Sequence, residues 1–236
     1  MATIPQALGT AVQHHQSGRL AEAEAMYRQI LNVHPTNADA LHLLGVVASQ
    51  AGHNESAVDL MRRAIQLRPD LAVPHLNLGN SLRALNRIEE AADAYRRAIQ
   101  LKRDFAEAHN NLGATLKEQG KLDEAIAAYG NAIQCRPGYA EAHNNLGVAL
   151  GEKNRLDEAV ASYRIALRLQ PEFADAHYNL GNALRDQRLS EDAIAEYRRA
   201  LGFRPKYALA WNNLATCWRA WADSTRPMRP IAGGSH

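Results

Sequence analysis

The sequence predicts an all-α fold, an α-solenoid of stacked 34-residue helix-turn-helix repeats. Two observations carry this prediction. Similar residues recur every 34 positions along most of the chain, and within each unit the apolar residues follow the spacing of helical faces. One helical hairpin buries too little apolar surface to offset its chain entropy, whereas stacked neighbours bury a continuous seam. We therefore expect one cooperative array.

The repeat is clearest between residues 72 and 207. Here a histidine followed three residues later by Leu-Gly comes into register four times, at His75, His109, His143 and His177. The expected domain, 4–221, comprises repeats 4–37, 38–71, 72–105, 106–139, 140–173 and 174–207 and a partial repeat 208–221. Residues 222–236 are expected to form an irregular tail, which could be native, truncated or added during cloning.

Each repeat is expected to contain two helices separated by a tight turn. Counting positions 1 to 34 within a unit, positions 4, 7, 8 and 11 share a face of the first helix, and 20, 24 and 27 share a face of the second. Residues that accept the left-handed conformation stand at the turn in five units: Gly18, Gly52, Asn86, Gly120 and Asn154. Arg188 breaks this rule. A proline closes most second helices, and Arg103 replaces it once, which predicts a softer end there.

Residues 106–139 carry a large residue, Leu-Gly, Ala, Tyr, Ala and Pro in the order typical of the tetratricopeptide repeat family, which the chain resembles over residues 4–221. The resemblance implies a right-handed superhelix whose first helices line a concave surface, and a role in protein interaction. The strings AEAHNNLGATLKEQGKLDEAIAAYGNAI and FADAHYNLGNALRDQ are similar to the repeat arm of O-linked N-acetylglucosamine transferases. Nothing resembles their catalytic domain, so we expect no enzyme activity and no cofactor.

Composition and charge disfavour several classes of partner. The 27 basic and 25 acidic residues leave a net charge of +2, which gives no reason to expect nucleic acid or a membrane surface as partner. The N-terminus lacks a signal-peptide pattern, and no apolar run approaches the roughly 18 residues of a membrane span, so we expect a cytoplasmic protein. The recurring histidines lie one repeat apart at a packing position and are expected to be core residues, not metal ligands.

Asparagine occupies position 6 of the first helix in five successive units: Asn77, Asn111, Asn145, Asn179 and Asn213. Positions 2, 6, 9 and 13 form a stripe separate from the packing face, so we expect this asparagine ladder to line the groove. An amide that donates and accepts at once suits the backbone of an extended peptide. The resemblance to the transferase arms implies the same role. Duplication of the repeat would also produce the ladder; we favour function, because most other exposed positions have drifted.

Further polar residues extend this candidate site. Four more amides, at positions 9 and 5, are expected to widen the polar track: Asn80, Asn182, Asn110 and Asn144. Four acids at position 2 could accept hydrogen bonds from a ligand or pair with its basic groups: Asp39, Glu107, Glu141 and Asp175. The helix dipole also favours acids in a first turn, and this structural explanation of the acids is the stronger one.

The C-terminal end predicts a second mode of interaction. The last helix carries Trp211, Trp218 and Trp221, and no following helix covers them. An apolar patch of this kind seldom stays solvated, so these tryptophans, or the basic tail, could join two copies of the chain. The leading function is a non-catalytic scaffold that binds extended peptides. The alternatives are a self-assembly module and the substrate-delivery arm of a larger glycosyltransferase-like enzyme.

Overall fold

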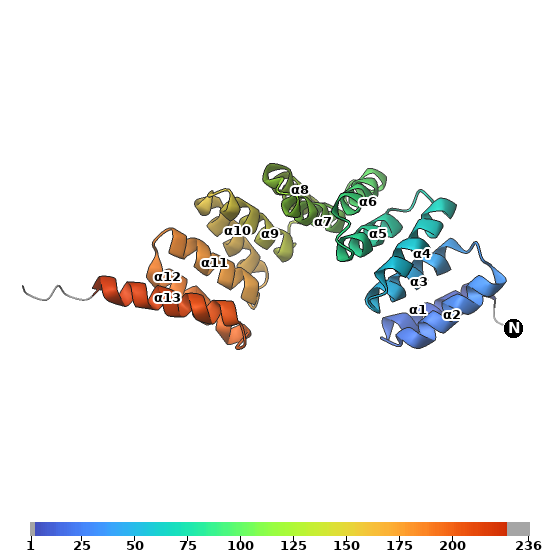
Figure 1. Cartoon of the computed structure of the whole chain (residues 1–236), viewed down its shortest axis with the longest axis horizontal. Helices are drawn as coiled ribbons and strands as arrows, with labels where there is room; N and C mark the ends of the chain where they lie inside the picture. The colour runs from blue at the N-terminus through green and yellow to red at the C-terminus, as the bar shows by residue number, and fades with distance from the viewer. Residues whose placement is uncertain (1–2, 226–236) are drawn as a thin grey trace, which may run out of the picture. The chain divides into compact units, whose positions relative to one another are not determined.

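The structure is a computed structural model that describes residues 3–225, with side chains described through residue 222. Thirteen helices and no strand occur in residues 3–225, which confirms the predicted all-α class (Figure 1). The chain forms two compact units, one ending at Pro137 and one beginning at Gly138. The grouping of all repeats into one cooperative domain stays a prediction.

The first unit stacks four helical hairpins. Its helices are α1 (Ile4–Gln16), α2 (Leu20–Val33), α3 (Ala38–Gln50), α4 (Asn54–Leu67), α5 (Ala72–Ala84), α6 (Ile88–Leu101), α7 (Ala106–Glu118) and α8 (Leu122–Cys135). Each first helix packs against the second helix of its own hairpin, and each second helix packs against the next first helix within the unit. The pairwise stacking predicted from the repeat is therefore present here.

The second unit contains two hairpins and one further first helix. Its helices are α9 (Ala140–Glu152), α10 (Leu156–Leu169), α11 (Ala174–Asp186), α12 (Ser190–Phe203) and α13 (Ala208–Thr225). Helix α13 packs against α12 and continues to Thr225, so residues 222–225 are helical where the sequence led us to expect the start of an irregular tail. The prediction for the remaining tail lies outside the described residues.

Glycine at position 8 lets the two helices of a hairpin approach closely over a buried tyrosine. In the hairpin α7–α8, Tyr129 is only 1% exposed. A Cβ atom added at Gly113 would lie 2.7 Å from Tyr129 Cε1 and 2.8 Å from its Cδ1, far inside van der Waals contact. The Leu-Gly pair and the tyrosine sixteen residues later are therefore two halves of one packing contact.

The turn inside each hairpin keeps one geometry whatever residue it carries. Gly120 and Asn154 adopt the left-handed conformation with φ of 75° and 58°. Arg188, the exception in sequence, does the same with φ of 65°. Its N–H donates to Arg185 O at 2.8 Å, and the next N–H, of Leu189, donates to Leu184 O at 2.9 Å. These hydrogen bonds fix the turn despite the unfavourable conformation of an arginine.

The missing proline does not move the end of α6. This helix ends at Leu101, two residues before Arg103, just as α8 ends two residues before its closing proline. Lys102 N–H donates to Ala98 O at 2.9 Å, and the equivalent bond in the next repeat, from Arg136 N–H to Ala132 O, is also 2.9 Å. Helix packing therefore sets this boundary without the proline.

The recurring histidines are core residues, as predicted: His75, His109, His143 and His177 are between 6% and 9% exposed. Two of them bind the loop that precedes their helix. His109 Nε2 lies 3.0 Å from Arg103 O, and His177 Nε2 lies 2.9 Å from Pro171 O. Since a carbonyl oxygen can only accept, Nε2 is the donor in both. These histidines fasten a first helix to the end of the repeat before it.

Candidate functional site

The five asparagines of the ladder lie on first helices and are all half-buried. Asn77 and Asn111 belong to α5 and α7 of the first unit. Asn145, Asn179 and Asn213 belong to α9, α11 and α13 of the second. Half-burial means that each amide is held by its surroundings while part of it reaches the surface.

In the first unit the ladder is built into a hydrogen-bonded network. Asn111 Nδ2 donates to Asn80 Oδ1 at 2.9 Å, and the hydroxyl of Tyr95 donates to the same oxygen at 2.8 Å. Burial raises the pKa of Tyr95, which keeps the phenol a donor. The position-9 amide therefore joins the tyrosine of its own repeat to the position-6 amide of the next.

Asn77, the first residue of the ladder, contacts a histidine of the preceding repeat. Asn77 Nδ2 lies 2.8 Å from His42 Nε2. The amide nitrogen can only donate, so Nε2 accepts and His42 is neutral. Burial, opposed by the charge of Asp39, lowers the pKa of His42 below its ordinary value, in agreement with this state.

The second unit repeats the same arrangement. Asn213 Nδ2 donates to Asn182 Oδ1 at 2.8 Å, and Tyr197 OH donates to that oxygen at 2.9 Å. Asn179 Nδ2 donates to Asn144 Oδ1 at 3.1 Å. The network in this unit thus also passes from repeat to repeat through side-chain amides.

These contacts leave the ladder with unused hydrogen-bonding capacity. An asparagine amide offers two N–H donors and one oxygen acceptor. Asn111, Asn179 and Asn213 use an N–H in the network, and within the described part of the chain no donor reaches their Oδ1 atoms. The network therefore orients the amides and leaves each an acceptor. Asn111 and Asn179 also keep a second N–H, whereas Asn213 Nδ2 donates its second N–H to Tyr178 OH at 3.2 Å.

Two hollows adjoin the network of the first unit. One of about 200 Å³ is lined by Val46, Ser49, Gln50, Met61, Asn77 and Asn80. Another of about 520 Å³ is lined by Asn80, Arg83, Ala84, Asn86, Ile88 and Glu118. Arg83 donates to Glu118 Oε1 through Nε at 3.0 Å and Nη2 at 2.8 Å, and this contact raises the pKa of Arg83. Asn80 borders both hollows.

The position-5 amides do not widen the exposed track as expected. Asn110 is 2% exposed and Asn144 is 6% exposed, because position 5 lies about 100° around the helix from position 6 and turns inward. Asn144 still contributes indirectly, since it accepts the hydrogen bond from Asn179. The two residues are part of the interior that supports the surface.

The position-2 acids have partners within their own repeats. Glu107 lies 3.5 Å from Arg136, and Asp175 receives two hydrogen bonds from Arg204, at 2.8 and 2.9 Å. These bonds from Arg204 hold the pKa of Asp175 below its ordinary value. Glu141 is exposed at the same position of its repeat. The pairs link the start of a first helix to the end of the second, which favours the structural explanation of the acids.

The tryptophans of α13 are largely accessible. Trp211 is 54% exposed and Trp218 is 53% exposed, while Trp221 Nε1 donates to Glu191 Oε1 at 3.0 Å. A hollow of about 210 Å³ between α12 and α13 is lined by Glu191, Ile194, Arg198, Trp218 and Trp221. The basic tail that could also join two copies lies outside the described residues.

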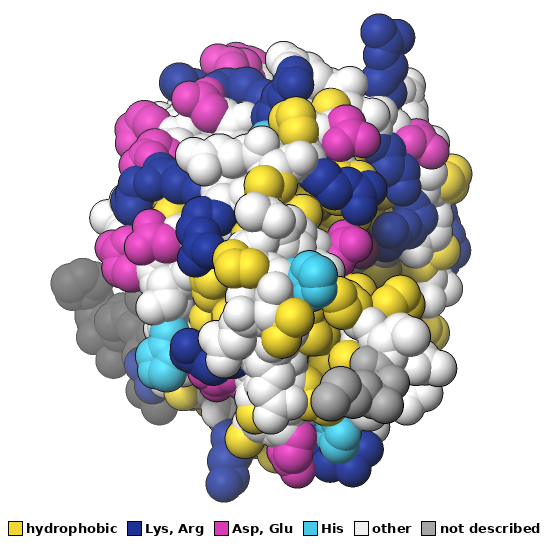
Figure 2. All heavy atoms as spheres, turned by 90° about the vertical axis from the view of Figure 1, so that its right-hand side faces the viewer, with side chains coloured by type: hydrophobic (Ala, Val, Ile, Leu, Met, Phe, Trp, Pro, Cys, Tyr) yellow, Lys and Arg dark blue, Asp and Glu magenta, His cyan; other side chains and the backbone are white. Residues whose placement is uncertain are grey.

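Other surface features carry less chemical information. Acidic and basic side chains are interspersed over the face seen in Figure 2, with hydrophobic side chains near its centre, so this face has no large field of one sign. No helix within residues 3–225 has the length and apolar character needed to cross a membrane. The same residues hold no group of three or more His, Cys, Asp or Glu arranged to bind a metal ion.

Three protein-family models match the chain, and all three describe tetratricopeptide-type repeats. The model described as TPR repeat matches residues 79–120 and 115–154. Models described as tetratricopeptide repeat match residues 144–208 and 14–70. Between them the matches include nearly all of the repeats inferred from the 34-residue period.

Solved structures show the same fold, and one curated protein matches part of the sequence. The structure of Pseudomonas aeruginosa pilF aligns with a TM-score of 0.80 at 18% identity, covering 90% of this chain and 97% of that one. YrrB, described as a TPR protein with an unusual peptide-binding site, aligns with a TM-score of 0.64 at 21% identity, covering 79% of this chain and 96% of that one. Cellulose synthase operon protein C of Komagataeibacter xylinus is 43% identical over 53 residues, which are 22% of this chain and 4% of that protein.

Proposed function

The chain belongs to the tetratricopeptide repeat family, whose arrays generally mediate protein–protein interactions, and on this premise we propose that it binds extended peptide segments through the asparagine ladder. The fold is typically a non-catalytic scaffold, and we propose that role here, in the cytoplasm. The closer likeness to the arm of an O-linked N-acetylglucosamine transferase, and with it a substrate-delivery role, also stays a proposal.

The observation that carries the proposal is the orientation of the ladder by its own network. Asn111 and Asn179 each donate one N–H to the neighbouring repeat and keep an oxygen and a second N–H. An extended peptide presents alternating N–H and C=O groups, which match such amides without regard to side-chain identity. Amides already held in place lose little conformational entropy on binding. The peptide-binding site of YrrB, a protein of the same fold, supports the proposal.

The remaining polar residues take secondary places in the proposed site. Asn77 and Asn145 continue the ladder, and Asn80 and Asn182 hold it through their bonds to the tyrosines. We keep Glu107, Glu141 and Asp175 as acceptors for basic groups of a ligand. Such a ligand would compete with the arginines for Glu107 and Asp175, so these acids add selectivity rather than most of the affinity.

The ladder can be tested with an array of random-sequence peptides. The variant Asn111→Ala/Asn179→Ala removes an amide from each unit, and Asn32→Ala/Asn131→Ala removes two exposed amides from second helices as a control. With equal helicity by circular dichroism, we expect the first variant to lose peptides that the wild type and the control bind. Binding that survives in the folded first variant would contradict the ladder.

Backbone recognition can be tested separately on one captured peptide. Methylation of its backbone nitrogens removes N–H donors without changing its side chains. We expect about tenfold weaker binding for each N–H that meets an asparagine oxygen, because the oxygen is left unpaired. If methylation changed the binding affinity at no position, the protein would recognise the peptide's side chains and not its backbone.

A second candidate function is self-association through α13. It is favoured by the exposure of Trp211 and Trp218 on one helix. The variant Trp211→Ala/Trp218→Ala should convert a dimer into a monomer in analytical ultracentrifugation. A wild type that is monomeric at high concentration would exclude this candidate.

A further inference from the structure

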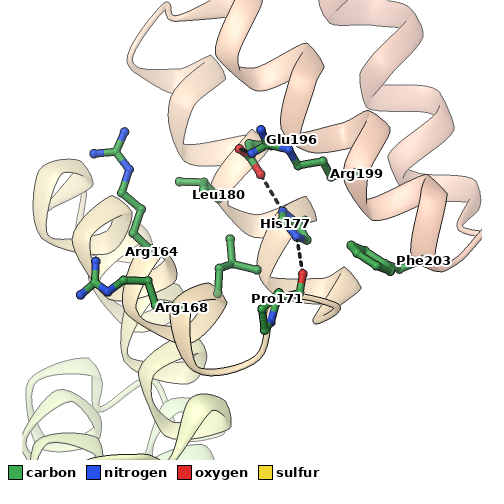
Figure 3. A pocket seen from close by; sticks show the side chains of 9 residues that line it. Arg164, Arg168, Pro171, His177, Leu180, Glu196, Arg199 and Phe203 are labelled. Carbon is green, nitrogen blue, oxygen red and sulfur yellow. Dashed lines mark hydrogen bonds and ion pairs between the residues drawn. The ribbon is translucent and has the colours of Figure 1, made fainter.

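A hollow of about 620 Å³ lies in the second unit beside α10, α11 and α12. It is lined by Arg164, Leu167, Arg168, Pro171, His177, Leu180, Glu196, Arg199 and Phe203. Figure 3 shows His177 between Leu180 and Phe203, and the rings of His177 and Phe203 are stacked with their centroids 5.7 Å apart. Most of these residues belong to second helices, whereas the asparagine ladder lies on first helices. The hollow is therefore a different surface from the proposed groove.

A buried charged cluster forms one wall of the hollow. Glu196 is 8% exposed; its Oε1 receives a hydrogen bond from Arg199 Nη1 at 2.5 Å, and its Oε2 lies 2.6 Å from His177 Nδ1. His177 Nε2 donates to Pro171 O at 2.9 Å. The Arg199 guanidinium pairs with the Glu196 carboxylate, and His177 contacts the other oxygen of the same carboxylate. The cluster thus pairs one buried carboxylate with one guanidinium.

The fold of the repeat does not require this cluster. The residues that occupy the position of Glu196 in the other repeats are Met26, Leu60, Ala94, Ala128 and Ser162. A buried carboxylate costs desolvation energy that a small or apolar residue at this position avoids. A costly departure from an otherwise repeated packing rule is typical of a functional site.

The rim adds two further positive charges. Arg164 and Arg168 are exposed and lie four residues apart on α10, a spacing at which like charges repel on a helix. Neither forms an ion pair with another described residue. In Figure 3 their guanidinium groups extend outward while their aliphatic stems border the hollow. An approaching ligand thus meets arginines first and an apolar floor behind them.

We propose that this hollow binds an acidic peptide segment that carries one bulky apolar side chain. The apolar side chain enters the hollow and contacts its apolar lining residues Leu167, Leu180 and Phe203, and the flanking carboxylates pair with Arg164 and Arg168. Glu196 does not repel the segment because Arg199 neutralises it. The proposal rests on charge complementarity: three arginines surround the hollow and Glu196 is the single acid among its lining residues. It goes beyond the asparagine ladder and does not depend on it.

The test is fluorescence anisotropy with a fluorescein-labelled heptapeptide in which one tryptophan stands among aspartates and glutamates. We expect the variant Arg164→Glu/Arg168→Glu to weaken binding about tenfold or more, because two attractions become repulsions. The control Arg198→Glu/Arg219→Glu reverses two other exposed arginines of the same unit with the same change in net charge and should leave affinity unchanged. Phe203→Ala should weaken binding about tenfold, whereas Leu169→Ala, at the same position of the preceding repeat, should not.

The outcomes separate the possible ligands. Binding that falls equally in both charge variants shows a nonspecific effect of net charge and overturns the proposal. The same holds if replacing the peptide's tryptophan by serine leaves affinity unchanged, if a single-stranded oligonucleotide binds the hollow more tightly than the peptide, or if the peptide does not bind. The binding of each variant to the peptides captured by the asparagine ladder is measured as well. If that binding is unchanged, a negative result for the hollow does not contradict the proposed function of the ladder.

Discussion

The close contact between Gly113 and Tyr129 predicts a penalty for adding a single methyl group. In Gly113→Ala the new Cβ would meet two ring atoms of Tyr129, at 2.7 and 2.8 Å, instead of the usual 3.5 Å or more. Tyr129 is only 1% exposed, so its ring has little room to withdraw. Overpacking of this kind costs about 1–3 kcal/mol, and the simultaneous clash with a rigid ring favours the upper half of that range.

A matched glycine in the same repeat removes the main competing effect. Alanine is favoured over glycine in a helix interior by roughly 1 kcal/mol, which would mask part of the penalty. Gly130 lies inside α8, and nothing approaches within 4 Å of a Cβ added there, so Gly130→Ala gains the helical preference without a clash. The difference between the two variants therefore isolates overpacking. We expect Gly113→Ala to be about 2–3 kcal/mol less stable than Gly130→Ala.

The assay is guanidinium chloride unfolding followed by circular dichroism, with the slopes compared to confirm that the transitions are alike. Because both glycines belong to one repeat, incomplete cooperativity along the array affects both variants similarly. In the double variant Gly113→Ala/Tyr129→Leu the penalty should largely disappear, since the ring is gone. A difference between the single variants below about 0.5 kcal/mol would refute the packing argument.

Three further predictions concern the turn, the network and a buried phenol. Arg188→Gly should raise the free energy of unfolding by about 1 kcal/mol, because Arg188 has φ of 65° and glycine adopts this conformation without strain; a lower unfolding midpoint would contradict this. Tyr95→Phe should lower the free energy of unfolding by about 0.5–1.5 kcal/mol, by removing the hydrogen bond to Asn80, and the loss should vanish in the background Asn80→Ala, as a double-mutant cycle would show. Burial raises the pKa of Tyr197 to about 12, above the value of about 10 in an unfolded chain, so its contribution to stability is full below pH about 10 and is lost as the pH rises to about 12. Tyr197→Phe should therefore flatten the fall of stability over that pH window, and an unchanged slope would refute the assignment.

The repeat pattern predicted the elements well because it records local contacts. Helical spacing, the turn glycines and the Leu-Gly pair act over at most sixteen residues, and each is repeated often enough to stand out from the sequence. The burial of His109 and His177 followed from the same packing face. Arg188 shows the limit: its type argues against a left-handed turn, but the hydrogen bonds of its neighbours impose one.

The candidate site was predicted less completely, because its bonds join different repeats. The sequence placed Asn111 and Asn80 on one stripe but gave no sign that Asn111 donates to Asn80. It also treated Asn110 as exposed, although this residue is buried. The recurring separation of 31 residues, from Asn80 to Asn111 and from Asn182 to Asn213, was the one available signal of this bond.

The sequence alone determined the helices, their pairing into hairpins and the face that each buries, because a fixed period and the demand for apolar burial admit few other arrangements. Only the tertiary structure decided which polar atoms meet. The bond between Asn213 and Asn182, and the cluster of His177, Glu196 and Arg199 beside a hollow, depend on offsets of about 1 Å between neighbouring helices. Apolar packing tolerates such offsets, whereas hydrogen bonds do not. The repeated sequence pattern therefore predicts the apolar contacts but not the hydrogen bonds.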